Sequence, residues 1–252
     1  VTRSKAKMLE YGVPEEHHIK ITQDPAKLFT ISIGLLGDLA AAINRGEPDP
    51  DSLAELKTNL LFSARFFDSY LQTKLNETLD PYLVLLGSAS YYLCDLPGSA
   101  SVLAKRIDGD CPDLDGDGLE DLLLWLLQAD LETYFDGADG AFGEFIDGTS
   151  KWILQFFEDG NGEDNLLDLA TKLKGAVYEF GTPRQLLFGD VIAAVLRKKL
   201  ENSTWKALPL YSGLPRDKWL HALQKDSFIK ELWPAQHLLG QANVLKGESA
   251  IV

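Results

Sequence analysis

The chain has 252 residues, of which 45% are hydrophobic and 25% charged, and its formal net charge is −14. This composition predicts a soluble globular protein that can bury a core large enough for one or two domains. No apolar run reaches the ~18 residues of a membrane span, no signal peptide is visible, and two cysteines, Cys94 and Cys111, are too few for a disulfide framework, so we expect a cytoplasmic protein.

Apolar residues recur at intervals of three and four along most of the chain, which predicts helices. Asp24-Pro25, Asp80-Pro81 and Thr182-Pro183 each place a capping side chain before a proline at the first helical position. The expected helices span residues 26–45, 51–75 (capped by Asp51 or Ser52), 81–94, a short helix from Ser99 or Ser101 to Ile107, 119–134, 150–158, 163–180 and 184–200. The small residues 87–90 predict close approach of a neighbouring helix, as in a helical hairpin.

The fold class expected is therefore all-α, a multi-helix bundle or stacked helical hairpins. A looser segment, residues 201–215, contains Pro209, Gly213 and Pro215. We expect this segment to separate a helical domain, residues 1–215, from a lead-in segment, residues 216–252. One β-strand is expected at the very end of the chain.

Acidic residues are concentrated between Asp108 and Asp168, where eighteen carboxylates accompany one base, Lys151, for a net charge of −17. Phosphate contacts need Lys and Arg, so this region is expected to face solvent or a basic protein partner rather than DNA. Any DNA contact would use Arg197-Lys198-Lys199, or Arg216 with Lys218. The simpler interpretation of both groups is a solvated helix end.

One acidic loop has the spacing of a calcium-binding loop, with Asp at positions 1, 3, 5 and 9 and Gly118 at position 6. Position 12, where calcium loops usually carry a bidentate acid, is Leu124. The simpler interpretation is a capped helix start, with Asp117 as cap and Glu120 as its capping-box partner. The metal candidates are Asp113, Asp115, Asp117 and Asp121.

The last twenty residues carry the most informative motif. Trp233-Pro234-Ala235-Gln236 is an aromatic-Pro-x-Gln element, and a Gly-x-Ser-x-Ile run begins at Gly247, eleven residues after Gln236. A side-chain amide both donates and accepts hydrogen bonds, so Gln236 can recognise the N6 and N7 edge of adenine. Trp233 can stack on the same base. These two residues are the candidate nucleotide contacts.

This ending resembles the entrance to the motor of superfamily 2 (DEAD/DEAH-type) helicases, in which the first strand of a RecA-like domain leads into the Walker A loop. Residues 86–93 with 96–99, and residues 118–127, are similar to the N-terminal helical region of bacterial anti-phage helicases such as those of Hachiman systems. No Gly-x-x-x-x-Gly-Lys-(Ser/Thr) occurs in these 252 residues. We therefore do not expect this chain alone to hydrolyse ATP.

The resemblance implies a parent protein that binds ATP and Mg²⁺ and acts on DNA through motor domains outside this sequence. It implies that the helical body regulates the motor or docks an effector nuclease of the same defence system. The simpler interpretation of the last twenty residues is a short amphipathic helix with a buried Trp and a surface Gln, followed by an edge strand. The residues also leave two alternative functions open. One is a stand-alone helical interaction or adaptor module with no motor. The other is a calcium-responsive binding domain.

Overall fold

The computed structural model describes residues 25–46, 49–72, 80–107, 118–128, 131, 140–225 and 228–249. This described part is helical and contains no β-strand, which confirms the all-α prediction. The helices are α2 (Pro25–Arg45), α3 (Pro50–Gln72), α4 (Pro81–Leu93), α5 (Pro97–Ala104), α6 (Leu119–Leu127), α7 (Gly143–Asp159), α8 (Glu163–Phe180), α9 (Pro183–Asn202), α10 (Thr204–Ser212), α11 (Arg216–Leu223) and α12 (Pro234–Gln241), followed by the 3-10 helix η2 (Val244–Lys246).

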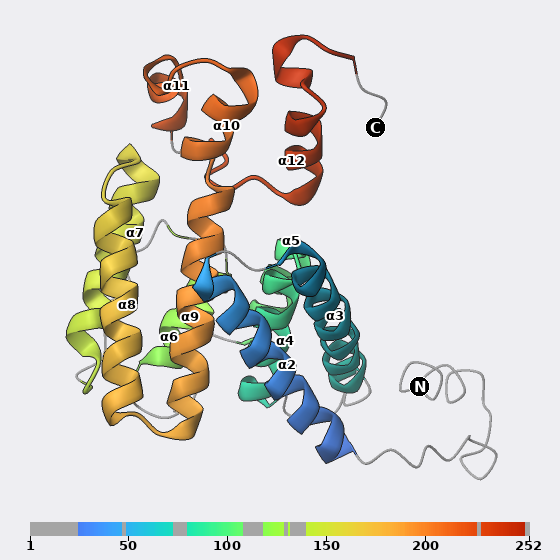
Figure 1. The fold of residues 1–252 in the computed structure, drawn as a ribbon. Coiled ribbons are helices and arrows are strands. Elements are labelled where there is room, and N and C mark those ends of the chain that lie inside the picture. Colours follow the sequence, from blue (N-terminus) through green and yellow to red (C-terminus); the bar gives the residue numbers. More distant parts are fainter. Residues whose placement is uncertain are drawn as a thin grey trace, which may run out of the picture.

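Helix α9 runs through the centre of the molecule, with α2 to α5 on one side and α6 to α8 on the other (Figure 1). It packs against α2, α4, α6, α8 and α10. Phe188, Ile192 and Leu196 of α9 are fully buried. Burial of such side chains is the main stabilising contribution to folding. The same hydrophobic cluster extends to Leu223 and Leu232, so residues on both sides of position 215 contribute to one core.

Asp-Pro and Thr-Pro pairs begin several helices, as predicted. The Asp80 carboxylate accepts a hydrogen bond from the Tyr82 backbone N–H at 3.0 Å, and Thr182 forms a capping box with Gln185. The expected cap of the second helix was wrong, because Asp49, rather than Asp51 or Ser52, accepts the bond from the Ser52 N–H at 3.1 Å. The reason is again a proline at the first helical position, Pro50, which makes the residue before it the cap.

Helices α4 and α5 form the predicted hairpin. The fully buried Ser88 hydroxyl donates to the Ala100 carbonyl at 2.7 Å, which places the two helices in close contact through small residues. Helix α5 begins at Pro97, earlier than the predicted Ser99 or Ser101, because Pro97 is preorganised for the first helical position.

Other boundaries differ from prediction. Helix α6 ends at Leu127 rather than near residue 134, and α7 begins at Gly143 rather than near residue 150. The segment expected to be loose, residues 201–215, contains helix α10 with Pro209 inside it. Trp205 explains this helix: the side chain is buried, and its indole N–H donates to the Phe157 carbonyl at 3.1 Å. Tertiary packing has overridden the local proline signal.

The predicted C-terminal strand falls mostly on residues 250–252, which lie outside the described residues. Just before them, Val244–Lys246 forms a 3-10 turn that ends at Gly247 in the left-handed region. Among the described helices, none combines the length and apolar character that crossing a membrane requires.

Candidate functional site

The C-terminal helices α10 to α12 sit at one end of α9 (Figure 1), and the chain between α11 and α12 returns to that end. Ser203 and Glu231 form an isolated antiparallel bridge. Next to it, the Thr204 N–H donates to the Lys230 carbonyl at 3.0 Å, and the Leu232 N–H donates to the Asn202 carbonyl at 2.8 Å. Residues 230–232 are thus fixed to the end of α9, immediately before the aromatic-Pro-x-Gln element.

The Glu231 cluster, formed by Tyr92, Lys199 and Glu231, reinforces this attachment. The Lys199 ammonium lies 3.0 Å from one Glu231 oxygen, and the Tyr92 hydroxyl donates to the other at 2.5 Å. The Lys199 and Glu231 side chains are only 2% and 13% exposed. Burial and the neighbouring Glu231 raise the pKa of Tyr92 well above its ordinary value, so the phenol stays protonated and acts as a donor. The cluster therefore joins α4, α9 and the lead-in segment through buried charge.

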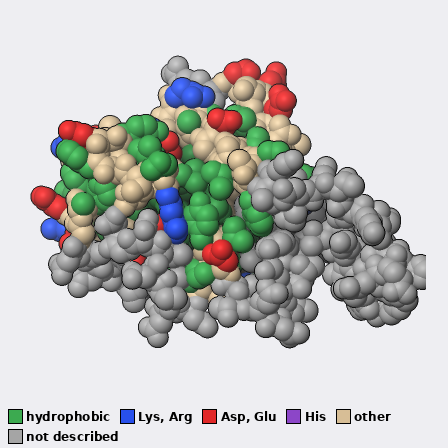
Figure 2. All heavy atoms as spheres, turned by 90° about the horizontal axis from the view of Figure 1, so that it is seen from below, with side chains coloured by type: hydrophobic (Ala, Val, Ile, Leu, Met, Phe, Trp, Pro, Cys, Tyr) green, Lys and Arg blue, Asp and Glu red, His purple; other side chains and the backbone are tan. Residues whose placement is uncertain are grey.

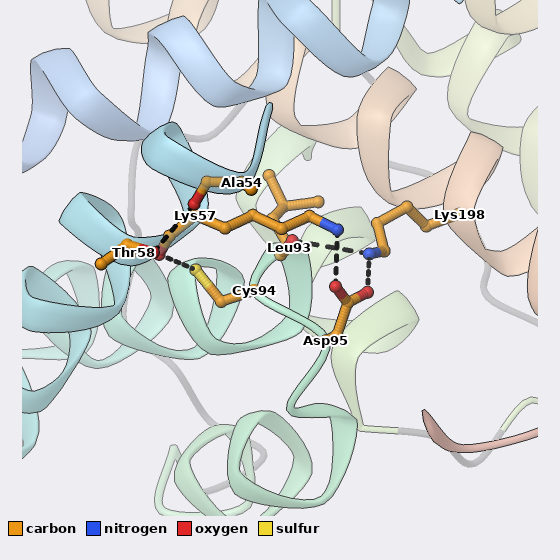
Figure 3. Close-up of polar contacts among 7 residues, drawn as sticks. All are labelled: Ala54, Lys57, Thr58, Leu93, Cys94, Asp95 and Lys198. Carbon is orange, nitrogen blue, oxygen red and sulfur yellow. Dashed lines mark hydrogen bonds and ion pairs between the residues drawn. The ribbon is translucent and has the colours of Figure 1, made fainter. Parts of the chain in front are cut away.

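A second group, the Asp95 cluster, consists of Lys57, Asp95 and Lys198 (Figure 3). Asp95 lies in the turn between α4 and α5 with a positive φ of 63°, a conformation that Asp tolerates better than most residues. Its carboxylate accepts from Lys57 of α3 at 2.6 Å and pairs with Lys198 of α9. Burial raises the pKa of Asp95, but the two lysines lower it more, so its pKa lies below the ordinary value.

The interpretation of residues 197–199 as a solvated helix end was wrong for two of its three members. Lys198 and Lys199 are buried, and each is paired with a carboxylate. Their aliphatic stems lie along the core while their ammonium groups reach carboxylates at its edge. Neither side chain is available to a DNA phosphate, which removes the main basic group that the sequence offered for nucleic-acid contact.

Cys94, which precedes Asp95, is a free buried thiol whose sulfur donates to the Lys57 carbonyl at 3.3 Å (Figure 3). Burial, followed by the adjacent Asp95 charge, raises its pKa to about 12. At neutral pH the thiol is therefore protonated and a poor nucleophile or metal ligand. The second cysteine, Cys111, lies outside the described residues.

A pocket of about 400 Å³ opens between α12 and the α4–α5 turn. Helix α12 contributes residues three, four and seven positions apart, which share one face of a helix. Tyr92 and Asp95 contribute to the wall formed by α4 and the α4–α5 turn. The lining residues are Tyr92, Asp95, Pro97, Asn202, Pro234, His237, Leu238 and Gln241. We call this site the α12 pocket.

His237 is held in the α12 pocket by its neighbour on α10. Its Nδ1 lies 2.8 Å from the Tyr211 hydroxyl, and the two rings meet edge to face. Burial lowers the pKa of His237. The imidazole is therefore neutral at pH 7, and its Nε2 is buried with no hydrogen-bond partner among the described residues.

The two predicted nucleotide contacts, Trp233 and Gln236, do not line the α12 pocket. Gln236 is the third residue of α12, and its side-chain oxygen accepts from the Trp233 backbone N–H at 2.7 Å, which caps the helix. The Trp233 ring is half exposed and packs against Gly98, so the burial expected for this side chain in the simpler interpretation of the ending was wrong. The cap uses the oxygen of the Gln236 amide and leaves its NH₂ group as a donor.

Of the calcium candidates, Asp113, Asp115 and Asp117 lie outside the described residues, and Asp121 is an exposed residue of α6. Glu120, expected to complete a capping box, is instead buried and lies 3.2 Å from the Arg184 guanidinium. The capping-box role was wrong because the N-cap residue of α6 is Gly118 (φ 77°), which has no side chain to cap with. Glu120 is then the second helical residue instead of the third. Within the described ranges, no three His, Cys, Asp or Glu side chains are grouped to hold a metal ion.

On the face of the molecule seen in Figure 2, the described side chains form no basic patch that would suit a nucleic acid. In Figure 2, hydrophobic side chains gather at the middle of the face seen from below, and the coloured Lys and Arg side chains are scattered. Arg216, a second DNA candidate, stacks over the Trp205 ring at 5.0 Å and donates to the Asp159 carbonyl at 3.0 Å. Its role within the described residues is to hold α11 against the end of α7.

Comparisons with models of protein families, with curated proteins and with solved structures found no match. The sequence proposed Trp233 and Gln236 as contacts and gave no indication of Asp95, Lys57 or Glu231. The available signal was the position of Lys198 and Lys199 shortly after the apolar run of residues 191–196, since buried lysines need carboxylate partners.

Proposed function

We propose that this chain is the helical accessory domain of an ATP-dependent superfamily 2 DNA helicase of bacterial anti-phage defence. In this proposal the motor follows the chain and binds ATP, Mg²⁺ and DNA, while the helical body regulates the motor or docks an effector nuclease in the cytoplasm. Support comes from the aromatic-Pro-x-Gln element at the start of α12 and from the Gly-x-Ser-x-Ile run after it.

The proposed regulation of the motor by the helical body is supported by one observation, the attachment of residues 230–232 to α9 and α4. Glu231 is held by Lys199 and Tyr92, with the two charged side chains largely buried. Breaking a buried pair by removing one partner costs about 3–5 kcal/mol, so the lead-in segment and the helical body should move together. A partner that shifts α4 or α9 would thereby reposition the start of the motor.

Gln236 allows a direct test, because its two possible roles differ chemically. As a helix cap it needs only a side-chain acceptor at the third helical position, which Glu supplies as well as Gln. For adenine recognition it needs an amide that both donates and accepts. Gln236→Glu should therefore retain the cap and lose adenine recognition, whereas Gln236→Ala loses both.

The test is to sequence the parent open reading frame beyond Val252 and then to assay the encoded protein for DNA-stimulated ATP hydrolysis. We expect Gln236→Ala and Gln236→Glu both to raise the KM for ATP at least about tenfold, with the thermal stability of Gln236→Glu unchanged. Hydrolysis absent with every nucleic acid tested, or a Gln236→Glu variant as active as the natural protein, would contradict the proposal.

A stand-alone interaction module is the alternative, and one observation favours it. Seven of the twelve exposed large hydrophobic side chains among the described residues lie between positions 210 and 245, namely Leu210, Leu214, Leu220, Ile229, Trp233, Leu238 and Leu245. Exposed apolar side chains are frequent at partner-binding surfaces. A native stop codon after Val252, together with recovery of one stoichiometric partner that is lost on Leu210→Glu substitution, would favour this alternative.

A further inference from the structure

The turn between α7 and α8 contains Asn161-Gly162, the one Asn-Gly pair in the sequence. An Asn-Gly pair is chemically reactive, because the backbone nitrogen of the second residue can attack the side-chain amide carbon of the first. Glycine has no Cβ to hinder that approach. The turn shares no residue with the proposed nucleotide contacts, so its chemistry does not depend on the motor proposal.

Both reacting groups are free in the folded chain. The Asn161 side chain is exposed. Among the described residues, neither its amide group nor the Gly162 N–H has a hydrogen-bond partner. Gly162 is the N-cap of α8, one position before the helix begins, so its nitrogen can react without any helical hydrogen bond being broken.

The fold requires the glycine that makes the pair reactive. Gly162 has a φ of 85°, in the left-handed region, and a Cβ atom there would lie 2.7 Å from the Trp152 ring. On the other side of Asn161, the Asp159 carboxylate accepts from the Asn161 backbone N–H at 2.8 Å. The main chain of the turn is thus held in place while the Asn161 side chain remains in solvent.

Asn165, in the first turn of α8, provides a comparison within the same chain. Its side chain is also exposed. The next residue is Leu166, whose N–H donates to the Gly162 carbonyl at 2.9 Å at the start of the helix. Attack on the Asn165 amide would require this hydrogen bond to open first. The two asparagines therefore differ in reactivity for a structural reason.

We infer that Asn161 is a site of spontaneous deamidation. The Gly162 nitrogen forms a bond to the Asn161 side-chain carbonyl carbon, the bond from that carbon to Nδ2 breaks, and the amide leaves as ammonia with the proton of the Gly162 N–H. Water then opens the five-membered imide at either carbonyl, which leaves an aspartyl or an isoaspartyl linkage. The aspartyl product places a negative charge at the positive end of α8, which is favourable. The isoaspartyl product lengthens the main chain by one atom and displaces Gly162 from Trp152.

Incubation of the intact chain for days at mildly alkaline pH, followed by proteolysis and mass spectrometry, tests this inference. We expect Asn161 to deamidate at least about tenfold faster than Asn165, because reaction at Asn165 requires local opening of α8. The chain unfolded in guanidinium chloride gives the unprotected rate at Asn161. Equal rates at the two asparagines of the native chain, or a native Asn161 that stays intact while the unfolded chain reacts there, would overturn the inference.

Two variants separate the chemistry from its structural effect. Asn161→Gln keeps a side-chain amide but would have to close a larger ring, so we expect no modification at this position on the same timescale. Asn161→Asp reproduces the aspartyl product and should keep the Tm of the fresh chain, whereas the aged chain, which also contains isoaspartate, should melt at a lower temperature. Deamidation of Asn161→Gln at the rate of the natural residue, or an aged chain free of isoaspartate, would refute the cyclic route.

Discussion

At the scale of single residues, the most consequential feature is a pair of adjacent lysines buried in α9. Lys198 and Lys199 find carboxylates that lie 103 and 32 residues away in the sequence. Helical periodicity can place both lysines on a helix, but it cannot show that Asp95 and Glu231 approach them. This is why the sequence predicted a solvated helix end and missed both charged clusters.

Replacing Lys199 with Met tests the importance of the Glu231 cluster. Because Glu231 would remain buried without its cation, we expect the free energy of unfolding to fall by about 3–5 kcal/mol in urea titration. The matched control is Lys172→Met, whose i,i+4 pair with Asp168 is exposed (61% and 62%) and should change stability by less than ~0.5 kcal/mol. Similar effects for the two variants would show that the buried pair has no special role.

Asp95 predicts a difference in acid stability. Its folded pKa lies below that of the unfolded chain, so its ion pairs stabilise the fold fully above about pH 4 and are lost as the pH falls through the folded pKa. Asp95→Asn keeps a residue that tolerates positive φ but removes the charge. We expect the variant to have a lower Tm at pH 7 and to lose less Tm than the unaltered chain between pH 5 and pH 2. Parallel curves across that range would refute the assigned role.

At the scale of elements, most helices could be predicted because local signals and tertiary packing agree. The periodicity and the Asp-Pro or Thr-Pro starts placed α2, α4, α8 and α9 close to their observed bounds. Helix α10 could not be predicted in this way. Its local signals, Pro209 and Gly213, indicate a loop, and only the burial of Trp205 against Phe157 makes the helix favourable.

The packing of α12 on α10 depends on Gly240. A Cβ atom at Gly240 would lie 2.2 Å from the Tyr211 ring, so Gly240→Ala must displace one helix from the other, at a cost of about 1–3 kcal/mol. Gly175 of α8 has nothing within 4 Å of such a Cβ, and Gly175→Ala should stabilise the protein by ~0.5–1 kcal/mol. Urea titration measures the stability of the two variants, and hydrogen exchange of the α12 amides measures the local protection of this helix. Equal protection of α12 in the two variants would contradict this packing.

At the scale of the whole molecule, the negative net charge disfavours binding of this chain to nucleic acid. The net charge is −14, and two of the candidate phosphate-binding lysines are buried. We expect this chain alone to bind a labelled DNA duplex more weakly than ~100 µM at physiological salt, measured by fluorescence anisotropy. Micromolar binding that weakens steeply with salt would instead require a basic surface beyond the described residues.

The candidate nucleotide contacts illustrate what a sequence motif leaves open. Spacing alone proposed Trp233 and Gln236, and the structure places both at the start of α12. The cap formed by Gln236 is an intrahelical role that any aromatic-Pro-x-Gln helix can have, so geometry and motif are compatible with more than one function. The α12 pocket was not visible in the sequence, because its walls come from α4, α5, α9 and α12.

We propose that the helical body and the motor are coupled through Glu231. The most direct measurement is DNA-stimulated ATP hydrolysis by the full parent protein beside its Glu231→Gln variant, with Lys172→Met as the control. Because Gln keeps a partner for Tyr92 but removes the charge that holds Lys199, we expect a several-fold change in the stimulated rate while the control is unaffected. An unchanged rate in Glu231→Gln, or no hydrolysis by the parent protein, would contradict the claim.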